Sequence, residues 1–149
     1  FILDARSHVG ASGLMQLMPA TARWTASKIG LDFRPEMITD RQVNLRLGTA
    51  YLKLVLDDFG GSAAMAAAAY NAGPTRPRRW REGPLMEVAP WAATIPVTET
   101  RDYVKKVLSN ASVYSALLEG NRTPALKVRL GQPIGPREAA AAPPDKDIP

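Results

Sequence analysis

The segment between Ser62 and Gly73 places the strongest constraint on how this chain can fold. Residues 63 to 70 are almost all alanine, interrupted by Met65, and alanine has the highest intrinsic helix propensity. Ser62 can cap the start of this helix, and Gly73 followed by Pro74 ends it. Because such small side chains let neighbouring helices approach closely, the segment predicts a tightly packed helical core.

Two longer helices are predicted on either side of the alanine segment. Residues 41 to 59 carry apolar side chains at helical spacing, with Thr39 or Asp40 as the candidate cap and Gly60 at the end. Residues 98 to 118 repeat the pattern, with acidic residues in the first turn and lysines further on, an order that suits the helix dipole. These two helices are expected to form most of the core.

A loop with two glycines precedes the first predicted helix. Gly10 and Gly13 permit a tight turn, and Pro19 suits the first turn of a helix that continues to Gly30. The loop also places Gln16 among apolar neighbours. These residues alone leave two interpretations open: a buried turn whose Gln16 amide is satisfied by backbone, or the floor of a ligand groove.

Residues 76 to 98 predict a long irregular excursion, because four prolines interrupt them. A short helix is expected near residues 87 to 91, and the excursion would form one wall of a groove. The run begins with the densest basic cluster in the chain, which we interpret as a solvated surface loop. Its arginines are Arg76, Arg78, Arg79 and Arg81.

Composition excludes several classes of function. The 149 residues suit one domain, and no apolar run is long enough to span a membrane. The chain has no cysteine and a single histidine, His8, so disulfides, thiolate sites and multi-histidine metal sites are excluded and no cofactor is expected. The net charge of +5 favours polyanions such as nucleic acid or an acidic cell wall, but no nucleic-acid recognition fold accompanies it.

The predicted organisation is one all-α domain over residues 1 to 120, followed by a tail. Residues 121 to 149 are rich in proline and alanine and offer few groups to bury, so we expect a flexible tail or linker there. No segment shows a convincing alternation of apolar and polar residues, the pattern that would indicate a β-strand. Because the chain begins at Phe1, we also expect a fragment or processed product whose targeting signal lies outside it.

Three ordered motifs resemble those of the soluble lytic murein transglycosylases, bacterial enzymes with a goose-lysozyme-like domain that cleave peptidoglycan. The resemblance covers about residues 1 to 118 and implies a lysozyme-like, all-α fold. The motifs are Gly10-Ala11-Ser12-Gly13-Leu14-Met15-Gln16-Leu17-Met18-Pro19, then Ala69-Tyr70-Asn71-Ala72-Gly73, then Glu99-Thr100-Arg101-Asp102-Tyr103-Val104.

The resemblance implies cleavage of the β-1,4 bond between N-acetylmuramic acid and N-acetylglucosamine, without water. One glutamic acid first protonates the departing oxygen and then, as a carboxylate, deprotonates the muramic C6 hydroxyl, which closes on C1 to give a 1,6-anhydro sugar. Such an acid needs a desolvated site to raise its pKa, and an apolar groove floored by Leu14, Met15 and Met18 could supply one. No second catalytic carboxylate is required.

Two departures from the family pattern stand out. The family's glutamate begins a Glu-Ser-x-aromatic motif, so if Phe1 is the aromatic residue, the glutamate lies three positions before it. The chain itself then contains no catalytic residue, and we expect this form to be inactive. Ala93 stands where relatives commonly carry a glutamate, which puts one polar contact to the glycan in doubt.

The remaining expectations follow from the same resemblance. Ser7 would position the catalytic carboxyl or a substrate group, whereas Gln16, Met18, Tyr70 and Asn71 would line the sugar subsites. From the residues alone, Tyr70 and Asn71 could equally be a core residue and a helix C-terminal cap. The alternative functions are a hydrolytic muramidase and a noncatalytic peptidoglycan-binding module. We expect a monomer in the bacterial periplasm or envelope, without nucleic-acid partners.

Overall fold

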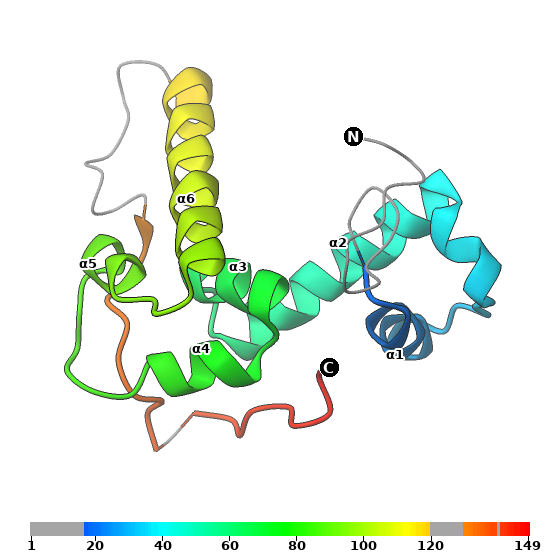
Figure 1. Cartoon of the computed structure of the whole chain (residues 1–149), viewed down its shortest axis with the longest axis horizontal. Coiled ribbons are helices and arrows are strands. Elements are labelled where there is room, and N and C mark those ends of the chain that lie inside the picture. The colour runs from blue at the N-terminus through cyan, green and yellow to red at the C-terminus, as the bar shows by residue number, and fades with distance from the viewer. Residues whose placement is uncertain (1–16, 120–129, 140) are drawn as a thin grey trace. The chain divides into compact units, whose positions relative to one another are not determined.

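The computed structural model describes residues 17–119, 130–139 and 141–149, with backbone alone described for 111–119 (Figure 1). The chain divides into two compact units, Phe1–Val55 with Asp145–Pro149, and Leu56–Pro144. Helix α2 contributes residues to both units. The domain boundary expected after residue 120 stays a prediction.

Two helices, α1 and α2, begin and end within about one residue of the bounds that the sequence indicates, whereas the 3₁₀ turn between them was not predicted. Helix α1 spans Pro19–Ile29 and stops at Gly30, whose φ of 69° is left-handed. A 3₁₀ turn, η1, spans Pro35–Thr39, and α2 spans Arg41–Asp58. Of the two candidate caps for α2, Asp40 is the one used, because its Oδ1 accepts a hydrogen bond of 3.0 Å from the Val43 amide.

The core of the first unit lies between α1, η1 and α2. Leu47, Tyr51 and Val55 are buried along one face of α2, as their spacing predicts. Trp24 of α1 meets the Tyr51 ring edge-on, with 6.3 Å between the ring centroids. The Tyr51 hydroxyl donates to the Pro149 carbonyl oxygen over 3.0 Å, so this end of the chain is part of the unit.

Helix α3, spanning Ala63–Ala72, is the centre of the second unit. The Ser62 hydroxyl caps it by accepting a bond of 3.3 Å from the Met65 amide, and Gly73, with a φ of 83°, follows its last turn. All six residues from 64 to 69 are buried. Helix α3 packs against α6, Thr98–Glu119, and against the short helix α4 (Figure 1). The predicted close-packed helical core is confirmed.

The prediction of an irregular excursion from residue 76 is wrong in its first part. The basic cluster begins on a helix, α4, which spans Thr75–Trp80. Pro77 does not prevent this helix because it sits in the first turn, where an N–H has no intrahelical partner. The short helix expected near residues 87 to 91 is present as α5, Val88–Ala93, and the Trp91 indole N–H donates to the Trp80 carbonyl oxygen over 3.0 Å.

The segment expected to be a flexible tail is packed where the structure describes it. Ile134 is 3% exposed and forms an isolated antiparallel β-bridge with Met86, through backbone hydrogen bonds of 2.8 and 2.7 Å. The Arg81 Nε donates to the Gly135 carbonyl oxygen over 2.9 Å, and an Arg137 Nη donates to the Asp58 carbonyl oxygen over 2.7 Å. Residues 130–139 therefore complete the second unit.

The all-α class is confirmed. Among the described residues, the bridge between Met86 and Ile134 is the one β pairing for which both partners are described. It is isolated, and the described elements are all helices. Across the same ranges, no helix is both long enough and apolar enough to cross a membrane.

Candidate functional site

The predicted site residues fall in different parts of the chain. Ser7 and Gln16 lie outside the described residues, as do Leu14 and Met15 of the expected groove floor. Met18 immediately precedes α1 in the first unit and is 39% exposed. Tyr70 and Asn71 belong to the second unit. The described candidates are therefore Met18 in the first unit, and Tyr70 and Asn71 at the end of α3 in the second.

Asn71 is held by a buried threonine from the third motif. It lies in the last turn of α3, and its Oδ1 is 2.7 Å from the Oγ1 of Thr100 in the first turn of α6. Thr100 is 1% exposed, whereas Asn71 is half-buried. Gly73, and not Asn71, occupies the C-terminal cap of α3, so the amide is not used to end the helix. The structure thus joins two motifs that are 29 residues apart in sequence.

Two tyrosines lie on the helices that this hydrogen bond joins. Tyr70 is half-buried in the last turn of α3, and Tyr103 is half-buried on α6, one turn after Thr100. Burial raises the pKa of the Tyr103 phenol above its ordinary value of 10.0, and the neutral phenol can donate a hydrogen bond. The sequence placed both Thr100 and Tyr103 inside the third motif but gave neither a role in the site.

Ala93 is exposed at the end of α5, in the same unit as Tyr70 and Asn71. The position at which the family resemblance implies a glutamate is therefore at the surface, where a longer side chain would meet solvent. Alanine at this position leaves no buried gap.

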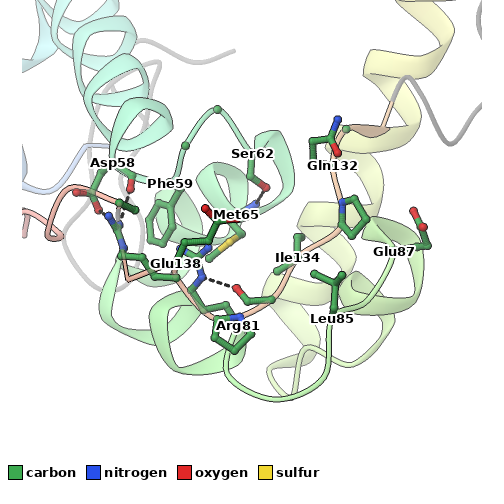
Figure 2. Close-up of a pocket in the computed structure, with 18 of the residues that line it drawn as sticks. Asp58, Phe59, Ser62, Met65, Arg81, Leu85, Glu87, Gln132, Ile134 and Glu138 are labelled. Carbon is green, nitrogen blue, oxygen red and sulfur yellow. Dashed lines mark hydrogen bonds and ion pairs between the residues drawn. The ribbon is translucent and has the colours of Figure 1, made fainter.

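A separate cavity of about 740 Å³ opens beside the start of α3 (Figure 2). Phe59, Met65, Leu85 and Ile134 contribute apolar surface to it, and neither Tyr70 nor Asn71 is among the described residues that line it.

Three charged groups that line this cavity, Asp58, Arg81 and Arg137, hold segments of the unit together. Asp58 accepts from an Arg78 Nη over 3.0 Å and lies 3.8 Å from an Arg137 Nη. Burial, followed by the nearby positive charge of Arg137, lowers the pKa of Arg81, whose Nε is already bonded to Gly135. We interpret the cavity as a gap between packed segments and not as the site that the motifs predict.

No metal centre is found among the residues that the structure describes. Within those ranges, no three histidine, aspartate or glutamate side chains gather closely enough to hold a metal ion.

Comparisons with known proteins agree with the motifs. Residues 1–84 match the family model described as "Transglycosylase SLT domain", and residues 94–122 match "Soluble lytic transglycosylase helical domain". A soluble lytic murein transglycosylase from Salmonella typhimurium is 42% identical over 113 residues, which make up 73% of this chain and 18% of that protein.

Solved structures are similar over most of the chain. A lytic transglycosylase Slt from Pseudomonas aeruginosa, described as an inactive glutamate-to-glutamine mutant, is 41% identical with a TM-score of 0.77, covering 91% of this chain and 22% of that one. A 70-kDa soluble lytic transglycosylase in complex with bulgecin A is 33% identical with a TM-score of 0.73, covering 88% and 22%. This chain spans about a fifth of the length of these relatives.

Proposed function

The chain belongs to the SLT transglycosylase family, and from that premise we propose that it forms the glycan-cleaving part of a peptidoglycan lytic transglycosylase. The observation that carries the proposal is the 41% identity, over 91% of this chain, to a lytic transglycosylase that a single glutamate-to-glutamine change leaves inactive. The proposed reaction cleaves the β-1,4 bond between N-acetylmuramic acid and N-acetylglucosamine and leaves a 1,6-anhydro end.

The proposed mechanism uses one glutamic acid twice. We place this glutamate three positions before Phe1, in the longer protein from which the chain would come. As an acid it protonates the departing glycosidic oxygen, and as a carboxylate it accepts the proton of the muramic C6 hydroxyl while that oxygen bonds to C1. Because the attacking hydroxyl belongs to the substrate, no water and no second catalytic carboxylate enter the reaction.

The chain's own residues would bind and orient the glycan. Tyr70 and Asn71 offer a phenol and an amide at the end of α3, suited to hydrogen bonds with the acetamido groups of the sugars. Met18, exposed before α1, would contribute an apolar contact. Ser7 and Gln16 keep the roles that the family resemblance implies, Ser7 near the catalytic carboxyl and Gln16 in a sugar subsite.

The cell envelope of bacteria is the proposed place of action. Relatives carry the name soluble lytic murein transglycosylase, and murein is found in that compartment. The net charge of +5 would favour an acidic cell wall over a neutral surface. We further propose that the protein acts as a monomer and has no nucleic-acid partner.

The experiment measures the muropeptides that three proteins release from purified peptidoglycan. The first is the longer protein, which includes the residues encoded upstream of Phe1, the second is its glutamate-to-glutamine variant, and the third is the 149-residue chain. We expect anhydro-muropeptides from the longer protein alone. Bulgecin A, present in one related structure, should bind the longer protein and slow its release of muropeptides. Reducing ends in place of anhydro ends would identify a hydrolytic muramidase. Retention of peptidoglycan without cleavage by any form would identify a binding module.

A further inference from the structure

We propose that Thr100 is a positioning residue, which orients the Asn71 carboxamide so that its NH₂ group faces the acetamido carbonyl of the bound sugar. This inference rests on the proposed function, because it assigns a role to a residue of the same glycan site. Neither the motif nor the family match gives Asn71 a partner. We assign that role to the buried Thr100, which determines whether the oxygen or the NH₂ group of the Asn71 amide faces the substrate.

The direction of the hydrogen bond follows from the burial of Thr100. Its hydroxyl carries one proton, and among the described residues the Asn71 side chain is its one hydrogen-bonding partner. At 1% exposure, the hydroxyl cannot give that proton to water. A buried donor without an acceptor is unfavourable, so Oγ1–H donates and the atom 2.7 Å away is the Asn71 carbonyl oxygen.

The opposite orientation of the amide is therefore disfavoured. Were the Asn71 NH₂ group to donate to Thr100, the threonine proton would lose the one acceptor that the described residues give it. With Oδ1 held toward the core, the NH₂ group is the end left for a ligand. Asn71 is half-buried and has no other described partner, so this donor is available at the end of α3.

The chemical class that such a donor recognises is an amide carbonyl. N-acetylated sugars carry one on every acetamido group, and a fixed N–H donor matches it directly. The arrangement is also rigid, because Asn71 and Thr100 belong to α3 and α6, two helices that pack against each other. A preorganised donor loses less conformational entropy on binding than a freely rotating amide.

The test uses the longer, active protein and measures kcat and KM separately on soluble glycan strands. Thr100→Val keeps the side-chain shape and removes the hydroxyl, so KM should rise about tenfold while kcat changes little. Thr100→Ser restores the hydroxyl and should keep KM within about twofold of the parent value. If Thr100 served stability alone, loss of folded enzyme would lower the apparent kcat and leave KM unchanged.

Two further variants keep the proposal testable even if Thr100→Val folds poorly. Asn71→Asp retains an acceptor for Thr100 but removes the NH₂ donor, so its KM should rise about as much as that of Thr100→Val. In an Asn71→Ala background, Thr100→Val should have no further effect on KM, because the two residues act through one contact. Thr49 is exposed on α2, so Thr49→Val is the matched control, and it should leave both kcat and KM unchanged.

The outcomes separate the two proposals. Absence of cleavage by the unmutated longer protein would refute the proposed function. Cleavage by that protein, together with an unchanged KM for Thr100→Val or for Asn71→Asp, would refute the role of Thr100 alone. A KM increase for Thr100→Val that persists in the Asn71→Ala background would also overturn it.

Discussion

Replacing Ile134 by alanine tests whether residues 130–139 are part of the fold. Ile134 is 3% exposed, and the substitution removes three carbon atoms from its side chain. At about 0.8 kcal/mol for each buried methylene, the lost transfer free energy is about 2.4 kcal/mol. The neighbouring cavity is open, so water can enter the space left behind and the additional cavity term should be small. We expect the second unit to lose about 2.5 kcal/mol of unfolding free energy.

Urea unfolding followed by tryptophan fluorescence measures this change. In a Trp24→Phe background, the signal comes from Trp80 and Trp91, both in the second unit. With an m-value of about 2 kcal/mol per molar urea, the midpoint should fall by about 1.2 M. Leu85→Ala is the control, because Leu85 is 70% exposed and its loss should change the unfolding free energy by less than about 0.5 kcal/mol. Equal, small effects of both substitutions would show that the segment is a tail after all.

Two further predictions concern charge. Asp58→Asn should lower the unfolding free energy by about 2 kcal/mol, because the Asp58 side chain is 8% exposed and its carboxylate faces two arginines. Glu36→Gln, in an ion pair exposed on both sides, should lower it by less than about 0.5 kcal/mol, and equal urea midpoints for the two variants would contradict the contrast. Burial raises the pKa of Tyr103, so its contribution to stability is present below pH 10.0 and is lost as pH rises through the higher folded-state pKa. Tyr103→Phe should therefore weaken the alkaline decline in stability and remove one late step from the absorbance titration of tyrosine; an unchanged titration would refute this.

Helices and their ends were the part of the fold that local sequence could predict. Pro19 and Gly30 bound α1, and Ser62 and Gly73 bound α3, because capping depends on the chemistry of residues within one turn of the helix end. The buried face of α2 was likewise predictable from its spacing.

Contacts between distant segments were not predictable in the same way. The prolines near Arg76 favoured a loop, and the pattern alone did not reveal that Pro77 falls in the first turn of a helix. The packing of Ile134 depends on pairing with Met86, which no local periodicity encodes. The sequence also predicted Asn71 as a site residue but could not reveal its partner, since Thr100 lies on another helix.

The most direct test of the proposed lytic transglycosylase activity is the chemical form of the muramic acid ends that the longer protein releases from purified peptidoglycan. Mass spectrometry before and after borohydride reduction distinguishes a 1,6-anhydro end, which is lighter by one water and resists reduction, from a hydrolysed reducing end. We predict anhydro ends from the longer protein and none from its glutamate-to-glutamine variant. Reducing ends from the active protein would contradict this prediction.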